Sequence, residues 1–221
     1  WIRKYVKESD VWEKSEKQSL SQMISKITGP YFKSVLKATL LTCFAMTLFW
    51  GVFTWLPTYL ALPVSEGGRG FTILKSSTFM YIYCAGTLVG YYSFGYLTHK
   101  FGVKPVFSFF IIMVGITIYG MINGSVNTIL LWSFCLGVFG SYYGVFGMVF
   151  FSMFPAEIRA TCQGLAYNVG RAVSGFAPVY VGAAAMSIGL NKALLTVIFL
   201  AAITLVYFLV FIPKIDLQKK A

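Results

Sequence analysis

Charged residues are scarce in this 221-residue chain, at 11%, while hydrophobic residues make up 57%. A soluble globular domain carries about 25% charged residues, so the composition argues against a soluble fold. The missing charges leave long uncharged runs at residues 38–65, 76–98, 105–156 and 193–213. A helix of about 20 apolar residues crosses a hydrocarbon core about 30 Å thick. The sequence therefore predicts an integral membrane protein.

Residues that usually carry catalysis or bind metals are also few. The four cysteines are widely spaced and form no C-x-x-C, and His99 is the single histidine. The chain has no G-x-S-x-G, H-E-x-x-H or P-loop motif, so we expect no enzyme, no cofactor and no metal site. The net charge of +11 comes without a nucleic-acid-binding motif, and we expect no nucleic-acid partner.

The uncharged runs predict six spans, because the run at 105–156 is too long for one crossing. The stretch "MINGSVN", residues 121–127, divides it, since clusters of Asn, Gly and Ser favour turns. The predicted spans are 36–62, 76–98, 105–122, 128–153, 161–186 and 192–212. None of them contains an Asp or Glu. We expect an all-α membrane protein whose transmembrane domain covers residues 36–213.

Basic residues predict the orientation of these spans. Fourteen Lys and Arg lie before the first span, in the second and fourth loops or after the last span, whereas three lie in the other loops. Cytoplasmic loops carry the Lys/Arg excess, so both termini are predicted to be cytoplasmic, in a protein of the cell (plasma) membrane. Residues 1–35 then form a cytoplasmic linker, and residues 214–221 a cytoplasmic tail.

The predicted linker contains one helical pattern. Leu20, Met23, Ile24 and Ile27 share a helix face, and Gly29-Pro30 ends it. Two readings are open, a helix lying on the membrane surface and a linker helix packed on loops.

Glycines at G-x-x-x-G spacing lie in two of the spans. They are Gly86 with Gly90, and Gly140 with Gly144. Small residues let membrane helices approach closely, so we expect these four glycines to pack helix against helix. Static packing explains each glycine taken singly, and the set suits helices that slide or rock against one another.

One loop carries a recognisable motif. The stretch "GYLTHKFGVKPV", residues 95–106, resembles the G-x-L-x-D-R-x-G-R-R-x loop of the major facilitator superfamily. The positions that match by residue or charge are Gly95, Leu97, Lys100, Gly102 and Lys104, while His99 stands where the family has an acid and Val103 where it has a base. A positive-inside loop alone also explains the lysines.

Three further stretches resemble organic-acid and metabolite:proton symporters of this superfamily, of the aromatic-acid, sialic-acid and monocarboxylate type. They are "WIRKYVKESDVW" (1–12), "WGVFTWLPTYL" (50–60) and "FPAEIRATCQGLAYNVGR" (154–171). The resemblance implies the central linker and helices seven to twelve of a twelve-helix transporter that works by alternating access. The implied partners are a small organic anion or metabolite, a proton, the lipid bilayer, and a missing N-terminal six-helix half or a second copy. In such relatives, the acids that bind the proton lie largely in the other half.

Arg171 stands near the middle of the fifth predicted span. An ionisable residue at that depth costs several kcal/mol, faces protein or water, and usually has a partner. A guanidinium offers donors suited to a carboxylate, so we predict that Arg171 binds the carboxylate of a substrate, with Asn168 alongside. The equally weighted alternative is a structural partner, such as carbonyls at a kink near Pro178 or a residue of the other half.

Other residues complete the predicted sites. Tyr142, Tyr143 and Tyr167 are candidates to line the cavity, since a phenol combines an apolar body with a polar tip. Glu157 and Arg159 are candidates for a cytoplasmic gate, with an ordinary exposed pair as the alternative. The predicted function is secondary active transport of a small organic anion, and the alternative is a membrane scaffold or inactive fragment that retains the helices.

Overall fold

The computed structural model describes residues 19–215, and the regular elements in this range are helices. In chain order they are α3 (Leu20–Thr28), α4 (Phe32–Phe53), α5 (Leu56–Ala61), η1 (Val64–Glu66), α6 (Ile73–Phe101), α7 (Val103–Asn123), η2 (Val126–Thr128), α8 (Ile129–Gly140), η3 (Ser141–Gly144), α9 (Val145–Met153), α10 (Ala156–Ser174), α11 (Ala177–Ile188) and α12 (Leu190–Phe211). The motif at residues 1–12, most of the predicted linker and most of the predicted tail lie outside the described residues.

Apart from α3 and η1, these elements form six long segments, some of which are interrupted by short breaks. The six segments follow the six predicted spans to within a few residues. Four are long and apolar enough to cross a membrane: Phe32–Ala61, Val103–Asn123, Val126–Met153 and Leu190–Phe211. Helices α6 and α10 have the length but are less apolar, because α6 contains several tyrosines and serines and α10 contains Glu157, Arg159 and Arg171. Helix α11 is apolar but short. The predicted all-α fold is confirmed.

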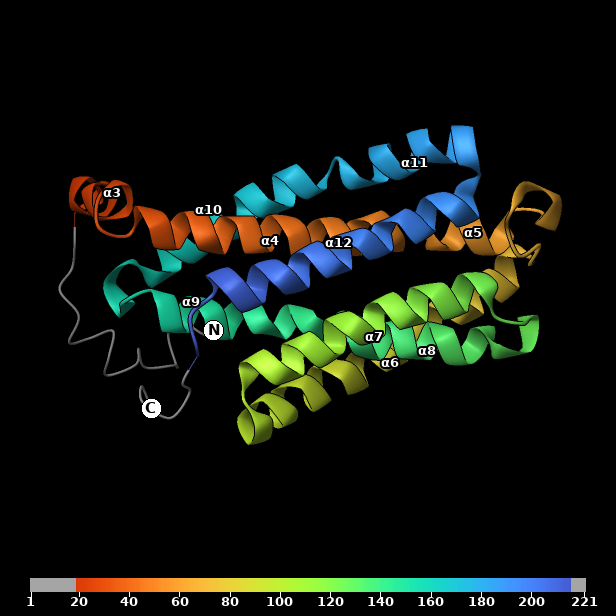
Figure 1. The fold of residues 1–221 in the computed structure, drawn as a ribbon, viewed down its shortest axis with the longest axis horizontal. Coiled ribbons are helices and arrows are strands. Elements are labelled where there is room, and N and C mark those ends of the chain that lie inside the picture. The colour runs from red at the N-terminus through yellow and green to blue at the C-terminus, as the bar shows by residue number, and fades with distance from the viewer. Residues whose placement is uncertain (1–18, 216–221) are drawn as a thin grey trace, which may run out of the picture.

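The segments form two groups (Figure 1). Helix α4 packs on α10, α11 and α12, while α6, α7 and α8 pack on one another. Helix α12 also lies along α7 and connects the groups. The buried residues at their contact are mostly aliphatic and aromatic.

Close backbone contact holds α6 against α8. A Cβ added at Gly86 would lie 2.2 Å from the Phe134 carbonyl oxygen, and one at Gly90 would lie 2.2 Å from that of Val138. Gly137 of α8 approaches the carbonyl of Tyr83 in return. These positions exclude any side chain, and they explain why small residues recur along both helices.

The second predicted glycine pair is placed differently. A Cβ at Gly140 would lie 3.5 Å from the Tyr83 hydroxyl, and one at Gly144 would lie 2.9 Å from the Phe94 ring. These two glycines therefore leave room for aromatic side chains of α6 instead of bringing two backbones together.

The two ends of the bundle differ in charge. At the end where α3 lies, called here the α3 end (Figure 1), the described cations are Lys26, Lys33, Lys37, Lys100, Lys104, Arg159 and Lys214. At the opposite end, called the α5 end, they are Arg69, Lys75 and Lys192.

Helix α3 follows the predicted helical pattern. A capping box formed by Ser19 and Gln22 starts it, and Gly29 ends it. Met23 and Ile27 are partly buried against the core, whereas Ile24 is exposed. Helix α3 contacts α4 and α10, so this helix rests on the ends of the spans.

Candidate functional site

Helix α10 is built from three different faces. Its buried face consists of Ile158, Cys162, Ala166, Gly170 and Ser174, spaced four residues apart and packed on α4. At Gly170 the approach is close, because a Cβ there would lie 2.5 Å from the Cγ2 atom of Thr42. This seam fixes the rotation of α10 about its own axis.

The rotation leaves two exposed faces of opposite character. One is apolar and consists of Leu165, Val169, Val173 and, past the end of the helix, Phe176, which are 41–73% exposed. The other has small and polar residues, namely Gly164, Tyr167, Asn168, Arg171 and Gly175. In a bilayer the apolar face suits acyl chains, whereas a charged face must meet protein or water. We call the second set the polar face of α10.

Arg171 lies deep along this segment. It follows the first residue of α10, Ala156, by 15 positions, which at 1.5 Å per residue is about 22 Å. The described segment continues to Ile188, so the guanidinium is carried near the middle of a helix pair longer than a bilayer core. The side chain is exposed on the described surface and is open to a ligand or to a second protein unit.

Asn168 lies one turn before Arg171 on the same face, where residues three apart are neighbours. Its Nδ2 atom donates to the Gly164 carbonyl at 2.7 Å. This bond holds the amide along the helix and leaves its carbonyl oxygen exposed. Asn168 and Arg171 are both exposed on the polar face of α10.

Aromatic side chains connect the polar face to the neighbouring segment. Tyr167 contacts Phe146 of α9 with ring centroids 6.0 Å apart, and Phe146 lies 5.3 Å from Tyr143. The Tyr143 hydroxyl is buried and has no hydrogen-bond partner among the described residues. A buried hydroxyl without a partner costs about 1–3 kcal/mol, so this group is locally destabilising in the described chain.

Tyr142 lines the small cavity between the helix groups that is described below, and most of its side chain lies in the core. It is 1% exposed, and its hydroxyl donates to the Ala45 carbonyl at 2.8 Å. The side chain therefore joins η3 to α4 inside the core and does not reach the polar face of α10. This placement favours a structural role for Tyr142.

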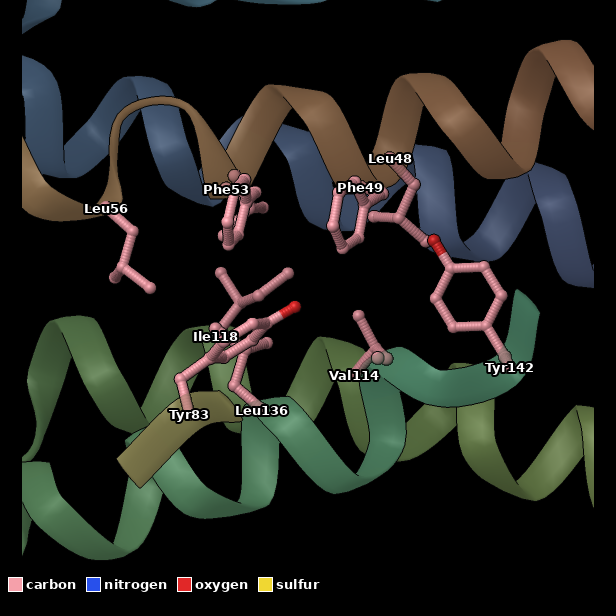
Figure 2. A pocket seen from close by; sticks show the side chains of 11 residues that line it. Leu48, Phe49, Phe53, Leu56, Tyr83, Val114, Ile118, Leu136 and Tyr142 are labelled. Carbon is pink, nitrogen blue, oxygen red and sulfur yellow. The ribbon is translucent and has the colours of Figure 1, made fainter. Parts of the chain in front are cut away.

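A small cavity lies between the two groups of helices (Figure 2). Phe49 and Phe53 of α4 approach it from one side, and Tyr83, Val114 and Leu136 from the other. It offers about 20 Å³, and a water needs about 10–15 Å³. The walls are almost wholly apolar, so this cavity is a packing defect between the groups and is too small for an organic acid.

Two helix breaks meet on the same side of the bundle. Pro57 and Pro178 lie at the starts of α5 and α11, and each proline lacks the N–H that would continue the preceding helix. The indole Nε1 of Trp55 donates to the Pro178 carbonyl at 2.9 Å. A Cβ at Gly182 would lie 2.8 Å from the same indole ring. The break between α4 and α5 is therefore held by a hydrogen bond against the break between α10 and α11, which lies about one turn after Arg171.

The loop motif at the α3 end turns at one glycine. Gly102 has φ +87°, a conformation that favours glycine, and it joins α6 directly to α7. Lys104 donates to the Leu209 carbonyl at 3.1 Å near the end of α12. His99 and Lys100 are exposed at the end of α6, and Gly95 has open space around its Cα. Gly95, His99 and Lys100 thus remain accessible at the α3 end, whereas Lys104 is bonded to α12.

Glu157 and Arg159, the predicted gate pair, lie in two different environments. Glu157 lies in the first turn of α10, where a carboxylate is favourable. Arg159 donates from Nε to the Phe154 carbonyl at 3.1 Å, and its guanidinium lies 4.3 Å from the Phe151 ring centroid. In the described chain, Arg159 thus fixes the α9–α10 connection.

Sequence reasoning missed the role of Arg69. Its Nη2 atom donates to the carbonyls of Met121 and Ile122 at 2.6 and 2.8 Å, and the guanidinium lies 5.8 Å from the Tyr59 ring centroid. A cation at a helix C-terminus is favourable, so Arg69 ties the loop after α5 to the end of α7. Nothing in the sequence around it, which also contains Glu66 and Lys75, pointed to this contact.

Comparison with known proteins gives three informative relatives, while no family model matches the chain. The chain is 32% identical over 184 residues to the sialic acid transporter NanX of Escherichia coli, covering 81% of this chain and 44% of that protein. It is 29% identical over 170 residues to a putative metabolite transport protein of Haemophilus influenzae, covering 76% and 40%. It is 24% identical over 222 residues to a probable 4-methylmuconolactone transporter of Cupriavidus pinatubonensis, covering 97% and 50%.

The chain is a relative of the major facilitator organic-acid and metabolite transporters. It spans about half the length of the relatives it matches. The resemblance read from the loop motif and from residues 50–60 and 154–171 is confirmed at the level of this family. The six segments are consistent with one all-α half of such a transporter.

Proposed function

We propose that this chain forms one half of a secondary transporter that moves a small organic anion across the membrane, with Arg171 binding the carboxylate. The observation that carries the proposal is the polar face of α10. A guanidinium at that depth is tolerated where it meets water or protein, and the apolar exposed face of the same helix already accounts for the lipid contact.

The chemistry of the polar face fits a carboxylate. Arg171 supplies a fork of charged donors, and Asn168 and Tyr167 lie beside it on α10. Phe146 and Tyr143 continue an aromatic series from Tyr167, and the Tyr143 hydroxyl is buried in the described chain. The series offers an apolar surface to the body of a substrate.

The names of relatives support this class of cargo. They include a sialic acid transporter, a niacin transporter of Acinetobacter baylyi and a cis,cis-muconate transport protein of the same organism. Each of these compounds carries a carboxylate. The relatives that we compared are all named as transporters, which disfavours the alternative of a scaffold without transport.

The proposed transporter has its α3 end in the cytoplasm, because the basic residues gather there. A second six-helix unit, either an N-terminal half or a second copy, covers the polar face of α10, and the two units rock about the site between them. Glu157, in the first turn of α10 at the α3 end, is the one acidic residue of the six described segments, so in this proposal an acid that binds the proton near mid-membrane is supplied by that second unit.

Uptake by the complete transporter in proteoliposomes tests the proposal. We expect Arg171→Gln to abolish uptake of labelled benzoate, a compact monocarboxylate, and Arg171→Lys to reduce it strongly, because an ammonium lacks the bidentate fork. Lys192→Gln removes a cation at the α5 end and serves as the matched control. Unchanged uptake by Arg171→Gln, with normal insertion into the membrane, contradicts the role of Arg171.

A pH gradient tests the coupling separately. Uptake that rises when the outside is made acidic, and falls when a protonophore is added, supports proton symport. If uptake responds to neither treatment but still requires Arg171, the proposed binding site stands and proton coupling is rejected.

A further inference from the structure

An apolar groove lies between α12 and the junction of α10 with α11. Thr47 and Gly51 of α4 line it as well. Its volume is about 640 Å³, which is within the range of about 300–1,000 Å³ that ligand pockets have. Its lining residues are uncharged. We call it the α4–α12 groove.

The groove lies at mid-depth on the lipid side of the bundle. Along α12 it extends from Thr196 to Ile203, and the midpoint of that 22-residue helix falls between these two residues. It also includes Val173 and Phe176, which belong to the apolar exposed face of α10. A bilayer at this depth contains acyl chains and no water. An occupant therefore has to be apolar where it contacts the groove.

One face of α4 connects the groove to cations at the α3 end. Along this face lie Thr47, Phe44, Lys37 and Lys33, at spacings of three, seven and four residues, which are the spacings of a single helix face. Lys33 and Lys37 are exposed. Lys37 precedes Thr47 by ten residues, or about 15 Å of helix rise, and half of a hydrocarbon core is also about 15 Å thick. The cations are therefore about one leaflet away from the groove.

Aromatic side chains lie between the cations and the groove, where α4 and α12 run side by side (Figure 1). The Tyr207 hydroxyl of α12 donates to the Lys37 carbonyl at 3.1 Å. The centroid of the Tyr207 ring lies 5.2 Å from that of Phe44 and 4.9 Å from that of Phe211. Ile203, one turn before Tyr207, already lines the groove. The rings thus form an apolar surface that continues from the lysines to the groove, and tyrosine is common at such a membrane–water boundary.

The charge at the α3 end favours an anionic partner. Lys214 follows α12 by three residues and is exposed, as Lys33 and Lys37 are. The described cations at this end outnumber its one described acid, Glu157. Each lysine near a membrane surface strengthens the binding of anionic lipid about fivefold. A molecule that matches both the cations and the groove has an anionic head group and a long apolar chain, as phosphatidylglycerol has.

We propose that α4 and α12 bind one anionic phospholipid from the leaflet at the α3 end. Its phosphate lies against Lys33, Lys37 and Lys214. One acyl chain follows the rings of Phe44 and Tyr207, and the end of that chain enters the α4–α12 groove. This site goes beyond the proposed function, because it lies on the lipid side of the bundle and requires neither the polar face of α10 nor transport.

Photo-crosslinking in phosphatidylcholine nanodiscs tests the site on the full 221-residue chain. The nanodiscs contain a small fraction of phosphatidylglycerol that carries a diazirine near the end of one acyl chain. After illumination, mass spectrometry of peptides measures the labelling of residues 196–203, which include the groove, relative to residues 81–92, which include an exposed face of α6. We expect this ratio to be about tenfold higher for phosphatidylglycerol than for phosphatidylcholine with the same diazirine chain.

Substitutions of lysine test the head group. Lys33→Gln combined with Lys37→Gln should lower the ratio for phosphatidylglycerol to that for phosphatidylcholine, because the two cations no longer attract the phosphate. Lys26→Gln combined with Lys100→Gln is the matched control. It removes two cations from the same end, on α3 and α6, and should leave the ratio unchanged. Circular dichroism checks that each variant retains its helix content.

Substitutions on α12 test the acyl chain. Ile203→Trp should fill part of the groove and lower the ratio about fivefold. Ala202→Trp is the matched control, since Ala202 is exposed at the same depth of α12 but does not line the groove. Lys192→Gln, which removes a cation at the α5 end, should have no effect.

Each contrary outcome rejects the site. Equal ratios for the two lipids, or an unchanged ratio in the variant that lacks both Lys33 and Lys37, overturns the proposed head-group contact. An unchanged ratio in Ile203→Trp overturns the proposed place of the chain. Equal labelling of the groove and of α6 identifies ordinary contact with the bilayer instead of a site. A lower ratio in Lys192→Gln places the head group in the opposite leaflet and also rejects the proposal.

Discussion

Replacing Gly170 with alanine should destabilise the bundle, whereas the same change at Gly164, on the same helix, should not. A Cβ at Gly170 would lie 2.5 Å from the Cγ2 of Thr42 and 3.0 Å from the backbone nitrogen of Cys43. At Gly164 a Cβ meets nothing within 4 Å. The two substitutions therefore add the same methyl group to α10 in opposite environments.

The magnitude follows from the contact. Thr42 is fully buried, and its hydroxyl donates to the Ala38 carbonyl at 2.8 Å, so its methyl group cannot rotate away without breaking that bond. Overpacking of this kind costs about 1–3 kcal/mol. The gain in helix propensity on replacing glycine, about 1 kcal/mol, applies to both variants and cancels in their difference. We expect Gly170→Ala to be less stable than Gly164→Ala by about 1–3 kcal/mol.

Reversible unfolding in mixed micelles, with increasing sodium dodecyl sulfate, measures the free energy of unfolding of both variants and of the parent. Circular dichroism of each folded variant checks that helix content is retained. Equal stability of Gly170→Ala and Gly164→Ala would refute the reasoning, since it would mean that α4 and α10 do not meet at Gly170.

Three further predictions use the same assay. Tyr142→Phe should lose about 1 kcal/mol with its 2.8 Å hydrogen bond, while Tyr143→Phe, whose hydroxyl is unpaired, should lose none; an equal loss contradicts the assignment. Trp55→Phe should lower the free energy of unfolding by about 1–3 kcal/mol, because it leaves the Pro178 carbonyl without its 2.9 Å donor. A variant as stable as the parent would mean that Trp55 does not hold the two helix breaks together. Arg69→Met should cost about 2–4 kcal/mol by removing two bonds to the end of α7; amide exchange there should accelerate, and unchanged exchange would reject this clamp.

Much of the fold was predictable because the signals are local. A bilayer crossing requires about 20 apolar residues without charges, and the uncharged runs meet that requirement wherever the chain lies in space. The segment ends fall close to the predicted ones for the same reason. The position of Arg171 along its segment also followed from counting residues.

Within the candidate site, sequence spacing was enough to group Asn168 with Arg171, since residues three apart share a helix face. It did not separate Tyr142 from Tyr143. These adjacent residues look alike in sequence, yet one donates a bond to Ala45 in the core and the other keeps an unpaired hydroxyl. Their fates depend on which neighbouring helix covers each side of η3.

The sequence by itself determined how many long segments the described residues form, how long these segments are, and where Arg171 lies along one of them. Only the tertiary structure decided which face of α10 packs on α4, which carbonyl receives the Trp55 indole 123 residues away, and which helix lies beside Lys37 of α4. The physical reason is that lipid is as apolar as a protein core. In a membrane helix, hydrophobicity therefore does not distinguish a buried face from an exposed one, and contacts between distant segments settle the difference.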